Sequence, residues 1–195
     1  MAMAWASAAD VDINVGVTLS TTGLAASLGI PEQNTMALLP KIISGHKVNY
    51  LVLDDRSDTV TATCNARRLV AESKVDVIMG STITPNSLAM IDVAAEVRTP
   101  MISLAASARV VEPVDAKRRW VFKTAQNDIM MALAIAKHVA NQGVRRVGYI
   151  GFADAYGEGW LQGFSKAAAL KRIDVSDDST TAAVSRRQVR PSRHR

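Results

Sequence analysis

The residues best suited to chemistry lie in short loops rich in serine, threonine and glycine. The loop 80–85 places the hydroxyl groups of Ser81, Thr82 and Thr84 directly before an expected helix. The first N–H groups of a helix have no partner within it, and the helix dipole is positive there, so this loop suits a carboxylate or a phosphate. Thr84 has an equally good alternative role as the helix cap. The loop is therefore a candidate anion site.

Three further loops allow a small ligand to approach the backbone. The loop 20–29 is rich in glycine and hydroxyl groups, but it lacks the glycine spacing of a dinucleotide cradle or a P-loop. The loop 103–108 is a turn of small residues, and the loop 152–159 offers the aromatic face of Tyr156. On composition alone, each loop is also typical of an ordinary turn.

Metal, cofactor and catalytic chemistry are not indicated. Asp54, Asp55 and Asp58 form an acidic cluster, but adjacent carboxylates on a strand point to opposite faces, and Asp58 suits a helix cap. We expect a structural turn there, no metal and no cofactor. The only cysteine, Cys64, excludes an intramolecular disulfide and is expected to be a buried, inert thiol. The three histidines stand beside no nucleophile, so no catalytic residues are predicted.

The composition indicates a globular protein with a neutral body. The chain has 195 residues, of which 48% are hydrophobic, enough to build a sizeable core. Its net charge of +5 arises from five arginines in the last ten residues, and positions 1–185 hold 18 basic and 18 acidic residues. The excess of basic residues therefore gives no reason to expect a nucleic-acid partner.

Short apolar strands alternate with amphipathic helices along the first two thirds of the chain. This order predicts parallel βαβ units, and therefore an α/β fold with a doubly wound parallel sheet. Residues 11–119 are assigned to an N-terminal lobe, in which Pro40 is expected to end or kink the first helix. Strands are expected at 13–19, 48–53, 75–79 and 101–103, and helices at 31–45, 58–73 and 84–97.

A second lobe is expected to begin near residue 120 and to be partial. It should contain strands at 120–124 and 147–150 and helices at 128–142 and 158–170. After Arg172 no packed element is predicted, and residues 173–195 are interpreted as a disordered tail or an out-of-frame stretch.

The first ten residues are interpreted as the remnant of a signal peptide. Ala6 and Ala8 have the spacing that signal peptidase favours, and a polar segment follows. The basic region and most of the apolar region of a complete signal are missing from the chain as given. No apolar run approaches the roughly 18 residues of a membrane span, so the protein is not expected to be membrane-embedded.

Six segments in register resemble the leucine/isoleucine/valine-binding proteins, which are the substrate-binding components of ABC importers. The resemblance extends from about residue 13 to about residue 172. The segments are Ile-Asn-Val-Gly-Val-Thr-Leu at 13–19, the Thr-Thr-Gly turn at 21–23, Val-Leu-Asp-Asp at 52–55, Gly-Ser-Thr-Ile-Thr at 80–84, Pro-Met-Ile-Ser-Leu-Ala-Ala-Ser at 100–107 and Asp-Ala-Tyr-Gly-Glu-Gly at 154–159.

This resemblance implies a periplasmic-binding-protein-like fold and a non-enzymatic role. Such proteins are two-lobed periplasmic clamps that close on an amino acid or a related carboxylate or amide and deliver it to a membrane ABC permease. Carried over by position, the ligand's charged groups would meet Thr84, the backbone of Ala105 and the hydroxyl of Ser107, with Ser81 nearby. Tyr156 would press on the ligand from the second lobe. Leu28 falls where leucine-type members place an aromatic side chain.

The chain also departs from the pattern of this family. Ser57 and Ile83 stand where the cysteines of its early disulfide are expected, and members are nearly twice as long. Two alternatives remain at this point. One is a ligand-sensing domain of the same fold that controls a regulator. The other is a nucleotide-dependent enzyme of Rossmann type, which the glycine-poor loops disfavour.

Overall fold

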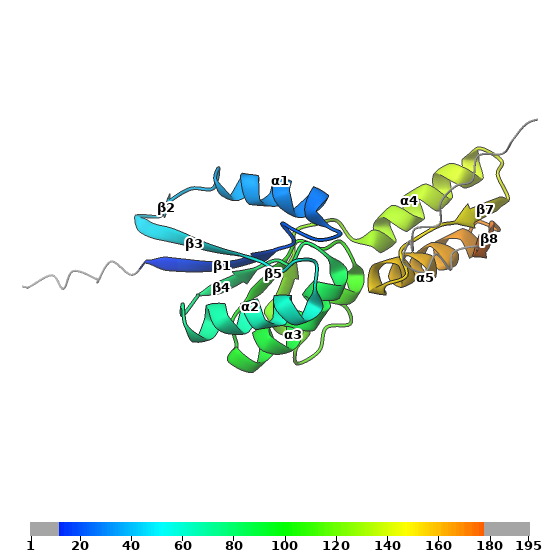
Figure 1. Ribbon diagram of the computed structural model, residues 1–195. Coiled ribbons are helices and arrows are strands. Elements are labelled where there is room, and N and C mark those ends of the chain that lie inside the picture. The colour runs from blue at the N-terminus through cyan, green and yellow to red at the C-terminus, as the bar shows by residue number, and fades with distance from the viewer. Residues whose placement is uncertain (1–11, 178–195) are drawn as a thin grey trace, which may run out of the picture. The chain divides into compact units, whose positions relative to one another are not determined.

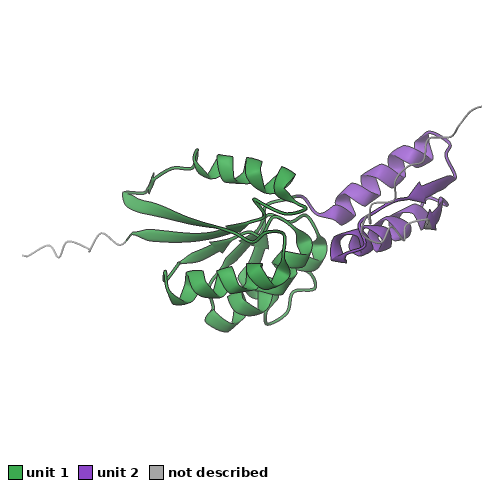
Figure 2. Cartoon of the chain, viewed as in Figure 1, with its two compact units in different colours: residues 1–125 green, residues 126–195 purple. Residues whose placement is uncertain are grey.

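The structure is a computed structural model that describes residues 12–177. The chain divides into two compact units, residues 1–125 and 126–195 (Figure 2). The expected signal remnant, and the part of the expected tail that follows residue 177, lie outside the described residues. No helix of the described part is long and apolar enough to cross a membrane.

The first unit is built on a sheet that, within residues 12–177, has six strands in the order β2-β3-β1-β4-β5-β6. β2 pairs antiparallel with β3, and every other neighbouring pair is parallel. Helix α1 (Ala26–Met36) covers one face, and α2 (Thr59–Ala71) and α3 (Thr84–Val97) cover the other (Figure 1). This confirms the doubly wound sheet. The strands are β1 (Ile13–Leu19), β2 (Ile42–Ile43), β3 (His46–Asp54), β4 (Val77–Met79), β5 (Met101–Ser103) and β6 (Val121–Lys123).

Two apolar clusters hold this sheet between its helices. One lies on the side of α1 and joins Val17 and Leu19 of β1 to Met36. The other lies on the side of α2 and α3 and includes Leu69 and Met90. Alternate side chains of a strand point to opposite faces, so a strand buried on both faces can serve both clusters. Continuous burial from Val15 to Ser20 places β1 at the centre of the sheet.

Helix α2 leaves its cysteine exposed. Its buried residues are Ala62, Ala66 and Leu69, whereas Val60 is 68% exposed and Cys64 is exposed. The prediction of a buried Cys64 was therefore wrong. A 3.6-residue period allows two neighbouring stripes on this helix, and the alanine stripe lies inward because small side chains let the helix approach the sheet closely.

Helix α1 begins earlier and ends earlier than predicted. Pro31 lies inside it instead of opening it, and the helix ends at Met36, before Pro40. A Cβ atom on Gly29 would lie 2.1 Å from the carbonyl oxygen of Ser20, so only glycine permits this approach of the helix to the end of β1. The start of α1 therefore depends on a tertiary contact that a local pattern does not reveal.

The second unit contains two parallel strands and two helices among its described residues. Helices α4 (Asp128–Asn141) and α5 (Ala155–Ala169) pack with β7 (Arg146–Tyr149) and β8 (Asp174–Asp177) around Ala132, Ala136 and Phe164. β8 corrects the prediction that no packed element follows Arg172. Its sequence carries one apolar residue, Val175, so backbone pairing with β7 forms a strand that side-chain patterning does not predict.

The border between the units lies later in the chain than the predicted border at residue 120. β6 pairs in parallel with β5, with Met101 opposite Val121 and Ser103 opposite Lys123, and so it belongs to the first unit. The sequence of a three-residue strand does not indicate which sheet the strand will join. Between β5 and β6 the chain forms two 3-10 turns, Ala108–Val110 and Arg118–Trp120.

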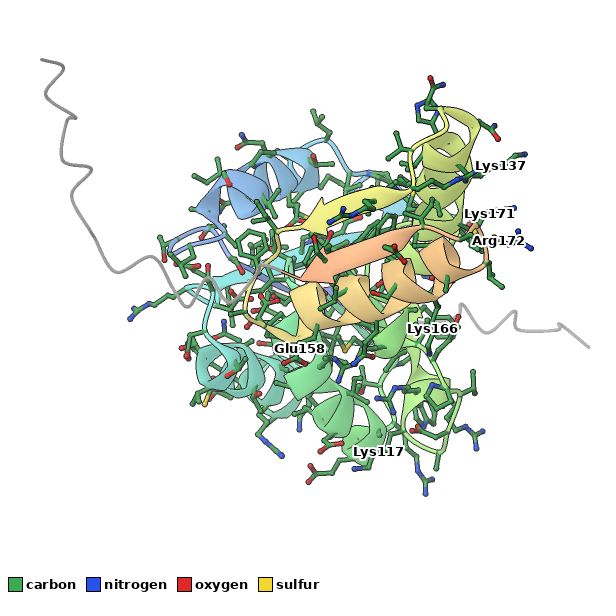
Figure 3. The ribbon with its side chains drawn as sticks, turned by 90° about the vertical axis from the view of Figure 1, so that its right-hand side faces the viewer. Lys117, Lys137, Glu158, Lys166, Lys171 and Arg172 are labelled. Carbon is green, nitrogen blue, oxygen red and sulfur yellow. The ribbon has the colours of Figure 1, made fainter. Side chains whose placement is uncertain are left out.

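Charged residues of the second unit are placed to suit its helix dipoles. Glu158 lies in the first turn of α5, and Lys166 lies in its last turn. Figure 3 shows Lys137, Lys171 and Arg172 near the end of this unit at which α4 and α5 finish. Cations near helix C-termini and anions near N-termini are mildly stabilising, so these charges have a structural explanation.

Candidate functional site

Four loops of the first unit converge at one edge of its sheet. β1, β3, β4 and β5 run parallel, so their carboxyl ends share that edge, which is where open α/β sheets bind ligands. Several polar side chains at this edge are buried, although polar groups are usually exposed. Buried members of this set are Ser20, Asp55, Ser81, Thr82, Thr84, Ser103 and Ser107.

Asp55 ties three of these loops together. The hydroxyl of Ser20 donates to its Oδ1 at 2.7 Å, the hydroxyl of Ser81 donates to its Oδ2 at 2.5 Å, and the backbone N–H of Ser57 donates to Oδ1 at 3.0 Å. The carboxyl group is fully buried. Because the proton of Ser81 is committed to Asp55, this hydroxyl can still accept a hydrogen bond from a ligand but not donate one.

Asp54 and Asp58 serve the backbone. Asp54 accepts hydrogen bonds from the N–H and hydroxyl of Thr22 and from the N–H groups of Thr21 and Arg56. Burial acts to raise the pKa of Asp54, but these hydrogen bonds outweigh it and hold the pKa below its usual value. Asp58 caps α2 by accepting from the N–H of Thr61 at 2.7 Å. Within the described residues no group of His, Cys, Asp and Glu could hold a metal ion.

Glu32 joins α1 to the loop after β4, a connection that the sequence did not suggest. The hydroxyl of Thr82 donates to Oε2 of Glu32 at 2.5 Å and accepts from the N–H of Ser20 at 3.0 Å. Burial raises the pKa of Glu32, and the nearby charge of Asp55 raises it further, against the lowering effect of the Thr82 hydroxyl. A single glutamate on an exposed helix gives no sequence signal for such a contact.

Thr84 is not the cap of α3, which removes one of the two roles considered for it. The cap position belongs to Ile83, which makes no side-chain cap bond, and Thr84 is the first helical residue with Pro85 after it. Thr84 is 2% exposed. Thr84 therefore opens the first turn of α3, where the helix dipole favours an anion.

The turn after β5 presents Ala105 and Ser107 in different ways. The N–H of Ala105 donates to the hydroxyl of Ser103 at 3.1 Å, so only its carbonyl oxygen is available to a ligand. The hydroxyl of Ser107 accepts from the N–H of Arg109 at 3.3 Å and keeps its own proton to donate. Ala105 and Ser107 thus suit a ligand cation and a ligand anion, respectively.

Lys123 of β6 holds the turn after β5 in place, a contact that the sequence did not suggest. Its Nζ donates to the carbonyl oxygen of Ala106 at 2.6 Å. In a trans peptide the next N–H points opposite to the carbonyl. The bond from β6 therefore fixes the direction of the N–H of Ser107.

Of the six residues named from the sequence, four lie together in the first unit. Ser81, Thr84, Ala105 and Ser107 are all buried in the segments that follow β4 and β5. Leu28 lies on α1 and is 57% exposed. Tyr156 belongs to the second unit, where its ring meets the ring of Trp160 edge-on, with centroids 6.4 Å apart.

Residues 12–185 match the model of a family described as periplasmic binding protein. The chain belongs to this periplasmic binding protein family. The match confirms the fold class and the resemblance stated from the sequence. Because the family is one of solute-binding proteins, it also confirms that the chain is not an enzyme.

Solved structures of ligand-binding proteins resemble this one. An extracellular ligand-binding receptor from Rhodopseudomonas palustris HaA2 is 46% identical, with a TM-score of 0.83 over 89% of this chain and 49% of its own. A leucine-binding protein from Thermotoga maritima is 24% identical, with a TM-score of 0.75 over 85% of this chain and 48% of its own.

A third relative was solved with an aromatic acid. It is a solute-binding protein of an ABC transporter from Rhodopseudomonas palustris BisB5, in complex with 3,4-dihydroxybenzoic acid. It is 23% identical, with a TM-score of 0.78 over 85% of this chain and 46% of its own. This periplasmic binding protein chain therefore spans about half the length of the structures it matches. No match is found among curated proteins.

Proposed function

We propose that this chain is part of the substrate-binding component of an ABC importer. In this proposal the protein captures an amino acid or a similar small carboxylate or amide outside the cytoplasmic membrane, in the periplasm, and delivers it to a membrane permease. The family supports a solute-binding role. One relative is named a leucine-binding protein and another was solved with 3,4-dihydroxybenzoic acid, and both of these compounds are carboxylic acids.

The observation that carries the proposal is the position of Thr84. It opens a 14-residue helix without capping it, so its hydroxyl and the first free N–H groups of α3 are available to a carboxylate. The hydroxyl of Ser107 offers a second donor in the loop after β5. A ligand carboxylate bound there needs no arginine or metal, because several neutral donors share its charge.

The remaining contacts complete the proposal. The carbonyl oxygen of Ala105 is available to a ligand ammonium or amide group, and Ser81 offers an acceptor beside it. We propose Leu28 as an apolar contact, since more than half of its side chain remains open to solvent. Tyr156 is proposed as an aromatic contact from the second unit.

The test is thermal unfolding of the 195-residue chain with a panel of amino acids and aromatic acids. Binding to the folded state increases the free energy of unfolding with the logarithm of the ligand excess, by about 2.7 kcal/mol at a hundredfold excess over Kd, and so raises the transition temperature. L-Leucine, benzoate and 3,4-dihydroxybenzoate are the first probes. A cooperative transition that one of them raises supports capture, and a transition that no carboxylate or amide moves contradicts it. Asp115→Ala, in a loop between the two 3-10 turns, is a matched control whose ligand response should equal that of the wild type.

A further inference from the structure

Two carboxylates, Asp55 and Glu32, belong to one chain of hydrogen bonds at the carboxyl edge of the first sheet. Ser20 joins them, because its hydroxyl donates to Oδ1 of Asp55 at 2.7 Å and its backbone N–H donates to the hydroxyl of Thr82 at 3.0 Å. That hydroxyl donates in turn to Oε2 of Glu32 at 2.5 Å. Asp55 is fully buried, whereas Glu32 is partly exposed. The chain therefore connects a buried carboxylate to one that solvent can reach.

The loop after β4 links this chain to the proposed carboxylate site. Thr82 stands two positions before Thr84, which opens α3. Ser81, on the other side of Thr82, donates its hydroxyl to Oδ2 of Asp55. A ligand carboxylate at Thr84 would thus add a further negative charge to an edge that already holds Asp55 and Glu32.

Basic side chains at this edge are too few to balance these charges. In segments 20–36 and 80–87 the one titratable side chain is Glu32. The loop after β3 adds Asp54, Asp55 and Asp58 against a single arginine, Arg56, which is exposed. The charge of Asp55 acts on Glu32 through space. Because like charges repel, an anionic ligand is held here at an electrostatic cost that a proton would relieve.

The number of hydrogen-bond donors indicates which carboxylate takes that proton. Among the described residues, Asp54 accepts four hydrogen bonds and Asp55 accepts three, whereas Glu32 accepts one. Donated hydrogen bonds stabilise the charged form of a carboxyl group. Burial also raises the pKa of Glu32. Glu32 is therefore the carboxylate of this edge that is most easily protonated.

We propose that Glu32 takes up a proton when a ligand carboxylate binds, so that the protein holds an anionic solute more tightly at acid pH than at neutral pH. The inference rests on the proposed function and adds its regulation by protons. Glu32 does not touch the ligand and acts through its charge. A neutral carboxyl group still has a carbonyl oxygen that accepts from Thr82, so protonation leaves this contact with the loop in place.

The direction of the pH dependence follows from the charge of the ligand. A bound anion raises the pKa of Glu32, so this pKa is higher in the complex than in the free protein. Binding takes up protons at pH values between the two, and the affinity falls as the pH rises through that window. For two charges at a partly solvated edge, the expected fall in affinity is about three- to tenfold.

The experiment is calorimetric titration of the 195-residue chain with benzoate from about pH 5.5 to about pH 8, where this ligand keeps its charge. At each pH the titration is repeated in two buffers with different ionisation enthalpies, and the difference in binding enthalpy gives the number of protons taken up. Wild-type protein should take up roughly 0.3–0.5 proton per benzoate where the affinity changes most steeply. Its affinity should be about three- to tenfold higher at the acid end of the range.

Glu32→Gln separates the charge of this side chain from its structural contact. Glutamine keeps an acceptor for Thr82 and cannot take up the proton. The variant should bind benzoate with no proton uptake and with an affinity that is constant over the range. At pH 8 it should bind about three- to tenfold more tightly than the wild type. A purely structural role for Glu32 predicts equal or weaker binding instead.

Glu72→Gln is the matched control. Glu72 is an exposed carboxylate that pairs with Arg68 at the C-terminal end of α2, whereas the N-terminal end of α2 follows the carboxyl edge. This variant should keep the proton uptake and the pH dependence of the wild type.

The outcomes distinguish this inference from the proposed function. If benzoate binds without proton uptake, or if Glu32→Gln keeps the pH dependence, the inference is overturned and solute binding stands. The same holds if L-leucine or an uncharged amide binds and benzoate does not, because the inference requires an anionic ligand. If no member of the panel binds the wild type, both ideas fall together.

Discussion

Ser81 donates its hydroxyl to Oδ2 of Asp55 over 2.5 Å, and this bond joins the loop after β4 to the loop after β3. Ser20, at the end of β1, donates to the other oxygen of the same carboxyl group. Three loops of the candidate site are thus held by one buried side chain. Loops fixed in this way hold their ligand groups in place before a ligand arrives, which reduces the ordering cost of binding.

Asp55→Ala should destabilise the first unit. The substitution leaves the hydroxyls of Ser20 and Ser81 and the N–H of Ser57 without their acceptor. At about 1–3 kcal/mol for each group that stays buried, we expect a loss of at least about 2 kcal/mol in the free energy of unfolding. Urea unfolding measures it. Asp58→Ala removes an exposed helix cap and should lower the free energy of unfolding by less. Equal losses would show that the buried network contributes no more to stability than the exposed cap does.

Thr84→Ala and Ser107→Ala should each weaken ligand binding without a matching loss of fold. Each removes a hydroxyl donor from the proposed carboxylate site, with an expected cost of about 1–3 kcal/mol in binding free energy. Calorimetric titration with the best carboxylate of the panel measures this cost. Thr84→Ser keeps the hydroxyl and should bind nearly as the wild type does. Unchanged affinity in both alanine variants would remove these two loops from the site.

Glu32→Gln should stabilise the protein at neutral pH and not at acid pH. Burial raises the folded-state pKa of Glu32 above its ordinary value of 4.5, so the folded protein binds a proton that the unfolded chain has already lost. Stability is therefore lost as the pH rises from about 4.5 through the folded-state pKa. Glutamine keeps an acceptor for Thr82 and carries no charge.

The effect of Glu32→Gln should be below about 1 kcal/mol, because this side chain is only partly buried and solvent screens its charge. Unfolding temperatures of both proteins between pH 4 and pH 8 measure it. The difference should grow with pH and then level off. A difference that is constant over this range would show that the charge of Glu32 does not contribute.

Gly80→Ala should be more harmful than Gly143→Ala, although both glycines have positive φ angles. Gly80 has φ of +113°, and an added Cβ would lie 2.0 Å from the carbonyl oxygen of Thr18. Gly143 has φ of +75° and open space around it. We expect about 1 kcal/mol for Gly143→Ala and more than about 2 kcal/mol for Gly80→Ala. Urea unfolding compares the two variants, and similar losses would contradict the steric argument.

Local sequence patterns predicted much of the sheet. The alternation at 13–19 and the short apolar run at 101–103 correspond to β1 and β5 with their bounds unchanged, and Asp58 caps α2 as expected. Each of these features depends on residues within one turn or one strand. The exposure of Cys64, the start of α1 and the pairing of β6 were missed, because each depends on contacts with distant segments.

The sequence by itself determined most of the strands and helices, the doubly wound order and the hydroxyl-rich loops that could bind an anion, but not β2 or β8. Only the tertiary structure decided which polar groups are already engaged. Asp55 meets Ser20 from 35 positions away, and Thr82 meets Glu32 from 50 positions away. Parallel strands bring such residues together only after the sheet has formed and its carboxyl ends share one edge. The same packing buries both polar atoms of the Asn86 side chain, which no local sequence pattern indicates.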